Sequence, residues 1–178
     1  MDIYLIRHGI TIWNEKGITQ GQTNNKLSKN GKLQVVGVAK DLKSVCFDLI
    51  FSSPLKRAMQ TSKILNKHNK TKIIKDRRLL DIDQGIFSGR EYARLSDEEK
   101  KLKTLRAKSC KMENIESLYK RLYDFVEYLK KFQYKNVLIV THGIAATYLE
   151  KIIKQEQVDF KKELKLAFNH AQIKRIEI

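Results

Sequence analysis

The sequence predicts an α/β fold: a three-layer sandwich in which helices flank a mostly parallel central sheet. Short apolar runs at 3–6 and 137–140 are typical of strands buried on both faces, as in parallel sheets. These runs alternate along the chain with segments of helical periodicity. One Pro, eight Gly and the lack of any low-complexity tract give no sign of disorder.

Length and composition favour a single domain covering residues 1–178. A chain of 178 residues can bury about 70% of its unfolded surface in one core. No linker divides the sequence, and we expect the charged stretch 88–113 to form a short cap or lid. The apolar start before Arg7 is too short for a signal peptide or a membrane span, and Cys46 and Cys110 form no C-x-x-C pair. We therefore expect a cytoplasmic protein with reduced thiols.

The first half of the chain predicts three strands, at 2–7, 47–51 and 71–75. A polar loop containing Gly21 and Asn25 follows the first strand, and a helix is then predicted from the spacing of Leu33, Val36, Ala39 and Leu42. After the second strand, Ser52-Ser53-Pro54 predicts a helix start with Ser as the cap and Pro54 in the first helical position.

The second half continues the alternation of helix and strand. Ser96 and Glu99 form a capping-box pattern inside the charged stretch. The apolar spacing over 115–132 predicts a strongly amphipathic helix whose aromatic and Leu stripe belongs to the core. A strand at 136–141, a helix at 144–154 and a final strand at 172–178 complete the prediction.

The most informative feature is a near repeat: LIRHGI ends the first strand and LIVTHGI ends the strand at 136–141. In open α/β sheets, ligands bind beyond the carboxyl ends of parallel strands. We therefore expect His8 and His142 to face one crevice, although they lie far apart in the sequence. The other histidines of the four, His68 and His170, are interpreted as structural.

Other residues at this rim suit an anion. Arg7 precedes His8, while Ser53 and Arg57 open the helix after the second strand, whose N-terminus adds partial positive charge. Gly9 and Gly143 are expected to leave room for a ligand to approach the backbone. Since Arg binds phosphate bidentately, phosphate is the expected ligand.

The formal charge of +16 raises the alternative of nucleic-acid binding. However, 27 Lys and 9 Arg are spread along the whole chain rather than gathered in a stripe. Because Lys is the solvated surface cation, we interpret the charge as a lysine-coated surface and expect no specific nucleic-acid partner.

The string Arg7-His8-Gly9-Ile10-Thr11 with Asn14, followed in order by SSPLKRAMQT from Ser52 and by Thr141-His142-Gly143, resembles the histidine phosphatase superfamily. The resemblance runs from Met1 to about Tyr148, and the final strand is weakly similar. It implies a phosphoglycerate mutase-like fold and points to the branch of small broad-specificity and α-ribazole phosphatases.

The resemblance also implies residue roles. His8 would be the nucleophile that carries a phosphoryl group, and Arg7, Arg57 and His142 would hold the phosphoryl oxygens. The further residues implied to bind substrate are Asn14, Thr11, Gln20, Gly21, Gly143 and Arg90. Because arginines supply the positive charge, we expect no metal and no cofactor.

The general acid departs from the family pattern. Asp81 in LLDIDQGIFSG stands where the family usually has Glu. Asp is one methylene shorter, and a displacement of about 1 Å can cost roughly a hundredfold in rate. Either the backbone compensates, or Asp83 takes the role, or turnover is slow; we favour Asp81.

Three functions follow from these patterns. The leading hypothesis is a metal-independent phosphatase acting on a small phosphorylated metabolite, since the cap is short. The second is a cofactor-dependent phosphoglycerate mutase, and the third a non-catalytic phosphate- or nucleic-acid-binding protein. Five basic residues form either a lid that meets the substrate or a solvated helical face: Arg90, Arg94, Lys100, Lys103 and Arg106. We expect no membrane partner, and the oligomeric state stays open, with a homodimer as one option.

Overall fold

The structure, a computed structural model, describes residues 1–158 and 167–177. A five-stranded sheet has the order β3-β2-β4-β1-β5. Its strands are β1 (Asp2–Arg7), β2 (Leu49–Ser52), β3 (Ile73–Lys75), β4 (Asn136–Thr141) and β5 (Ile173–Glu177). β1 to β4 run parallel, and only β5 is antiparallel to its neighbour. The predicted mostly parallel sheet is confirmed, although residue 178 of the final predicted strand lies outside the described residues.

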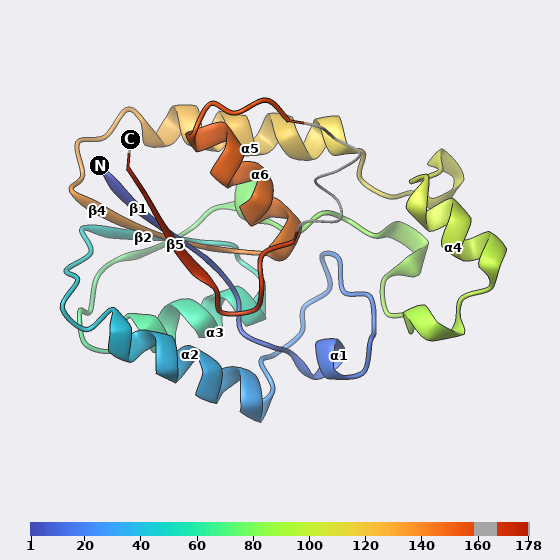
Figure 1. Ribbon diagram of the computed structural model, residues 1–178, viewed down its shortest axis with the longest axis horizontal. Coiled ribbons are helices and arrows are strands. Elements are labelled where there is room, and N and C mark those ends of the chain that lie inside the picture. The colour runs from blue at the N-terminus through green and yellow to red at the C-terminus, as the bar shows by residue number, and fades with distance from the viewer. Residues whose placement is uncertain (159–166, 178) are drawn as a thin grey trace.

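Helices cover both faces of the sheet (Figure 1). α2 (Lys29–Asp41) and α3 (Lys56–Leu65) lie on one face, and α5 (Ile115–Leu129) and α6 (Gly143–Ile153) lie on the other. The predicted three-layer sandwich is therefore confirmed. The short helices α1 (Ile12–Glu15) and α4 (Asp97–Thr104) lie beyond the carboxyl ends of the parallel strands. Four 3₁₀ turns complete the elements: Arg77–Leu79, Gly85–Phe87, Tyr92–Arg94 and Lys108–Cys110.

The continuous apolar runs fit this arrangement because successive side chains of a strand point to opposite faces. In β4, Val137 and Ile139 pack into the core beneath α5 and α6, whereas Leu138 and Val140 pack beneath α2 and α3. Each of these four side chains is fully buried.

The predicted helix is present as α2, but only part of the apolar stripe that predicted it is buried. Leu33 is 71% exposed, whereas Gly31 and Val35 are buried. A Cβ on Gly31 would lie 1.9 Å from the carbonyl oxygen of Ile10. The helix backbone therefore packs directly on the turn that follows His8, and that close approach fixes which face points inward.

The start of α3 was also predicted wrongly. The helix begins at Lys56 with Leu55 as its N-cap residue, so Pro54 does not occupy the first helical position. The Asn24 side chain accepts from the Lys56 backbone N–H at 2.8 Å. Ser53 is thereby free of the capping role that its sequence position predicted. α5 likewise ends at Leu129, before the predicted limit at Phe132.

The charged stretch 88–113 forms a projection beyond the carboxyl ends of the strands (Figure 1), which we call the cap. The predicted capping box is present, since Ser96 and Glu99 close the N-terminus of α4. The base of the cap pairs with the loop after α1: Ile18 forms a β-bridge with Glu91, and the Thr19 N–H donates to the Arg90 carbonyl at 2.9 Å. In the two described stretches of chain, no helix has both the length and the apolar character needed to cross a bilayer.

Candidate active site

The two histidines of the repeated motif lie side by side. β1 and β4 are adjacent parallel strands in which Arg7 pairs with Thr141, so the next residues, His8 and His142, emerge at the same edge of the sheet. Their ring centroids are 5.2 Å apart, and both side chains are buried. The strand register alone thus brings together residues that are far apart in the sequence.

Arg57 joins these two rings. Its Nε donates to His8 Nε2 at 3.1 Å and lies 3.2 Å from His142 Nδ1. Its two terminal nitrogens donate to the backbone carbonyls of Thr23 and Gly21 at 2.8 and 2.7 Å. The side chain is fully buried, and loop carbonyls therefore hold the guanidinium in one orientation.

Hydrogen bonds fix the tautomers of both rings. His8 Nδ1 donates to the Gly9 carbonyl at 2.8 Å, which leaves the lone pair on Nε2, facing Arg57. His142 accepts from Arg57 at Nδ1 and therefore donates from Nε2 to Ser53 Oγ at 2.8 Å. Both rings are held neutral, with one nitrogen each directed at the same guanidinium.

Burial sets the charge state of the rings. Desolvation first, and then the positive charges of Arg57 and Arg7, hold the pKa of His8 well below its usual value. For His142, desolvation and Arg57 again lower the pKa far below the ordinary range. A neutral imidazole at physiological pH is a competent nucleophile or hydrogen-bond partner.

Asp81 is the carboxylate of this group. Its Oδ2 accepts from Arg57 Nη2 at 3.1 Å and lies 3.7 Å from His142 Nδ1. Burial raises the pKa of Asp81, although the cations Arg57 and Arg7 act in the opposite direction. We refer to Arg7, His8, Arg57, Asp81 and His142 as the histidine pocket.

Asp83 lies elsewhere. Its Oδ1 accepts from the Gly85 N–H at 2.9 Å, and its backbone carbonyl accepts from Arg106. These contacts belong to a turn at the base of the cap. Of the two candidate acids, the structure therefore brings only Asp81 into contact with Arg57.

The backbone of Asp81 is anchored by residues that the sequence did not single out. Arg121 Nη2 and Gln22 Nε2 each donate to the Asp81 carbonyl at 3.1 Å, and Arg121 also pairs with Glu113. Arg121 lies on α5, whose sequence indicated only a core helix. These contacts hold the shorter Asp close enough to reach Arg57.

The glycines do not leave open space as predicted. A Cβ on Gly143 would meet the Arg7 guanidinium at 3.1 Å, and one on Gly9 would meet the Gly31 carbonyl oxygen at 2.6 Å. The first makes room for Arg7 and the second for α2. Gly21 has a φ of +52° and contributes its carbonyl to Arg57.

Thr11, Asn14 and Gln20 form a polar cluster just beyond His8. Thr11 Oγ1 lies 2.9 Å from Asn14 Oδ1 and 3.0 Å from Gln20 Oε1, and Thr11 and Asn14 close the capping box of α1. The N–H of Gly9, which follows His8 in the sequence, donates to Thr61 Oγ1 of α3. The three predicted side chains are thus close together, held mainly by each other.

Arg90 is separate from the histidine pocket. It forms an ion pair with Glu99 of the cap at 2.6 Å, and its side chain is 40% exposed. Arg94 and Lys100 likewise pair with acidic neighbours three residues away. Lys103 differs, because it is half-buried and donates to Thr19 Oγ1 at 2.7 Å; burial and nearby Arg106 lower its pKa to about 8.

A further histidine lies beside His8. His170, interpreted as structural, lies with its ring centroid 5.8 Å from that of His8. Its position, in a loop before an edge strand, carries no motif. The only available signal was its place immediately before a strand that turned out to pair with β1.

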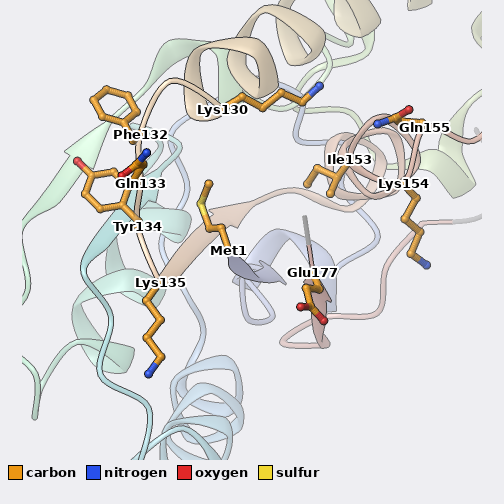
Figure 2. A pocket seen from close by; sticks show the side chains of 10 residues that line it. All are labelled: Met1, Lys130, Phe132, Gln133, Tyr134, Lys135, Ile153, Lys154, Gln155 and Glu177. Carbon is orange, nitrogen blue, oxygen red and sulfur yellow. The ribbon is translucent and has the colours of Figure 1, made fainter.

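A hollow lies at the end of the sheet opposite to His8 and His142 (Figure 2). Met1 and Lys135, which precede β1 and β4, line it together with Phe132, Tyr134 and Ile153. Its volume is about 960 Å³, and it contains none of the predicted site residues. Among the described residues, no three His, Cys, Asp or Glu side chains are grouped to hold a metal ion.

Comparison with known proteins connects this geometry to a family. The family model of the histidine phosphatase superfamily (branch 1) matches residues 3–178. Phosphoserine phosphatase 1 of Hydrogenobacter thermophilus is 29% identical over 154 residues, covering 80% of this chain and 71% of that protein. The Escherichia coli O1:K1 / APEC protein named probable phosphoglycerate mutase GpmB is 30% identical over 152 residues, covering 82% and 71%.

A solved structure shows the same fold. The α-ribazole phosphatase from Shigella flexneri aligns with a TM-score of 0.89 at 23% identity, over 100% of this chain and 91% of that one. The architecture described above is therefore a known fold.

Proposed function

The chain belongs to the histidine phosphatase superfamily, and on that premise we propose that it is a metal-independent phosphatase that hydrolyses a small phosphomonoester through a phosphohistidine on His8. The observation that carries the proposal is the Arg57 Nε placed between His8 Nε2 and His142 Nδ1. A group held there by Arg57 lies within reach of both imidazoles.

The first chemical step follows from the tautomer of His8. Nε2 attacks phosphorus in line, the N–P bond forms and the bond from phosphorus to the ester oxygen breaks. Asp81, protonated, donates its proton to the departing oxygen. Arg57, Arg7 and His142 stabilise the charge on the equatorial oxygens.

The second step returns the enzyme to its starting state. Asp81, now a carboxylate, takes a proton from water as that water attacks phosphorus. The N–P bond breaks, phosphate is released, and Nε2 regains its lone pair. The raised pKa of Asp81 and the lowered pKa of His8 both favour the protonation states that this cycle needs.

The relatives indicate candidate substrates. Proteins similar to this chain are named for activity on phosphoserine and α-ribazole phosphate, and both substrates are small phosphomonoesters. The mutase alternative has support from the relative named phosphoglycerate mutase. We favour hydrolysis because a mutase must shield its phosphoenzyme from water, and the cap here is short. We further propose a cytoplasmic, single-domain enzyme.

The test is hydrolysis of p-nitrophenyl phosphate in EDTA by the wild type and by His8→Ala, with His68→Ala as the matched control. Loss of at least about 10³-fold in His8→Ala, with the control unchanged, supports the proposal. Undiminished activity in His8→Ala refutes it. Isomerisation of 3-phosphoglycerate without release of phosphate would replace it with the mutase.

The non-catalytic alternative has its own readout. It expects no turnover of any phosphomonoester and duplex DNA binding whose affinity falls steeply with salt. Retention of that DNA binding in Arg57→Ala would assign it to the lysine-rich surface instead of the histidine pocket.

A further inference from the structure

Two buried polar atoms near His8 have no hydrogen-bond partner within the described parts of the chain: Arg7 Nε and His170 Nε2. Leaving a buried polar atom unpaired costs about 1–3 kcal/mol. Buried polar atoms in native proteins are nearly always paired, so two such atoms around one side chain call for a shared explanation. A ligand that accepts hydrogen bonds from both is the simplest one.

Hydrogen bonds hold the backbone around His170 beside the end of β1. Gln34 of α2 donates from Nε2 to the His170 carbonyl at 2.9 Å, and its Oε1 accepts from the Ile10 N–H at 3.3 Å. The next residue, Ala171, donates its N–H to the Arg7 carbonyl at 3.2 Å. The same amide side chain thus fixes the turn after His8 and the loop that carries His170.

The two rings are close enough to serve one ligand. Their centroids are 5.8 Å apart, and their planes are inclined by 61°. Arg7 Nη1 donates to the carbonyl of Phe168, two residues before His170, at 2.5 Å, and the charge of Arg7 lowers the pKa of both rings. His8, Arg7 and His170 therefore come together where β1 ends.

We propose that His170 is a third imidazole of the phosphate site, which binds an oxygen of the transferred phosphoryl group through Nε2. The inference rests on the proposed function, because it assumes that a phosphoryl group sits beside His8. It adds a phosphate-binding residue from the loop before β5, outside the two repeated motifs. It also gives the unpaired Nε2 a partner.

The charge of this ring depends on the ligand. Burial and the positive charge of Arg7 lower the pKa of His170 to about 4, so the ring is neutral at pH 7 without a ligand. A bound dianion favours the imidazolium form and raises that pKa. The charged or titratable groups that face the ring are Arg7 and His8, at the end of β1. Gln34 of α2, which contacts the His170 carbonyl, is uncharged. Anion binding should therefore take up protons.

The direct test follows the ring itself. We would record histidine-ring NMR spectra of the wild type over a pH range that extends below the pKa of about 4 of His170, with and without saturating sulfate, which stays a dianion over that range. His170→Gln and His68→Phe each remove one signal and so identify it. The expected result is a rise of at least about one unit in the pKa of His170 when sulfate binds. An unchanged titration of that ring overturns the inference.

A second measurement compares sulfate affinity by calorimetry in the wild type, His170→Phe, His170→Gln and the control His68→Phe. We expect His170→Phe to weaken sulfate binding about tenfold at pH 6, which corresponds to one lost charge-assisted hydrogen bond. His170→Gln should keep part of the affinity and lose part of its pH dependence, since it retains a polar group without a titrating ring. Affinity in both variants equal to that of the wild type overturns the inference.

These readouts separate the two proposals. If the wild type hydrolyses p-nitrophenyl phosphate but substitution of His170 leaves the sulfate affinity unchanged, the proposed function stands and the inference fails. If sulfate binding depends on His170 but no phosphomonoester is hydrolysed, the anion site stands and the proposed function fails. Thermal unfolding of each variant checks that it is folded.

Discussion

The histidine pocket and the cap are both rich in charge, yet they hold their charges in opposite ways. In the pocket, Arg57 is fully buried, and its partners come from four distant parts of the chain, including Gly21 and Asp81. In the cap, Arg94 and Lys100 pair with acidic residues three positions away, and Arg94 is 81% exposed. The first arrangement depends on the whole fold, and the second only on a helical turn.

Burial determines how much each charge contributes to the free energy of folding. An exposed ion pair contributes about 0–1 kcal/mol, because water and side-chain entropy offset the attraction. A buried charge that loses its partner costs several kcal/mol. Substitutions in the pocket should therefore damage both catalysis and stability, whereas those in the cap should change only what is bound.

The largest effect is expected for Arg57→Ala. It removes the group that joins both imidazoles and leaves Asp81 and two loop carbonyls without their donor. We expect kcat/KM to fall at least about 10³-fold and the free energy of unfolding to fall by about 3–5 kcal/mol. Phosphatase assays and urea unfolding measure both. Arg94→Ala is the control, and equal effects in the two variants would abolish the contrast.

Asp81→Asn should come next. Without a proton donor, kcat on an alkyl phosphate such as phosphoserine should fall about 10²-fold or more. The loss on p-nitrophenyl phosphate should be smaller, since nitrophenolate departs without a proton. Asp83→Asn serves as the matched control. A greater loss in that variant would transfer the acid role to Asp83.

The pH dependence of activity tests the protonation states of His8 and Asp81. His8 must be neutral and its pKa is lowered, so acid impairs it only well below the usual histidine range. Asp81 must be protonated and its pKa is raised, so activity declines as pH rises above that pKa. We expect kcat/KM to increase as pH falls from about 8 towards about 5. Activity that instead rises with pH through about 6.5 would mean that His8 titrates as an exposed histidine.

The smallest effects belong to the cap. Lys103→Met removes the contact with Thr19 and should raise KM for phosphoserine by roughly 2–10-fold, the equivalent of one hydrogen bond. Its kcat on p-nitrophenyl phosphate should stay within about twofold, because no atom of the histidine pocket is touched. Glu99→Gln, which removes the charge of the partly exposed pair with Arg90, is the control and should change neither constant. A large loss of kcat in Lys103→Met would contradict this prediction and show that the cap takes part in the chemical step.

The sequence predicted well whatever depends on local pattern. Apolar runs located β1 and β4, and the repeated His-Gly placed His8 and His142 at one edge once the two strands proved adjacent. Family motifs pointed to Arg57. Local patterns carry this information because the strand period and the ends of parallel strands determine where such residues emerge.

What the sequence could not predict depends on long-range contacts. Arg121 supports Asp81 from a helix whose pattern indicated only a core stripe. The buried face of α2 is determined by the close approach of Gly31 to Ile10, and that approach is a tertiary contact. His170 joins the site through the pairing of β5 with β1, at a position that carries no motif.

The sheet order has a consequence for how the protein is made. β1 lies between β4 and β5, so it finds both of its neighbours in the sheet only after β4 and β5 have been synthesised. Until then Arg7 and His8 sit on an unpaired edge, and a nascent or truncated chain has no means of turning over substrate. Enzymatic turnover would thus report that the sheet has formed completely. This makes it a useful readout in experiments on chaperone dependence or premature termination.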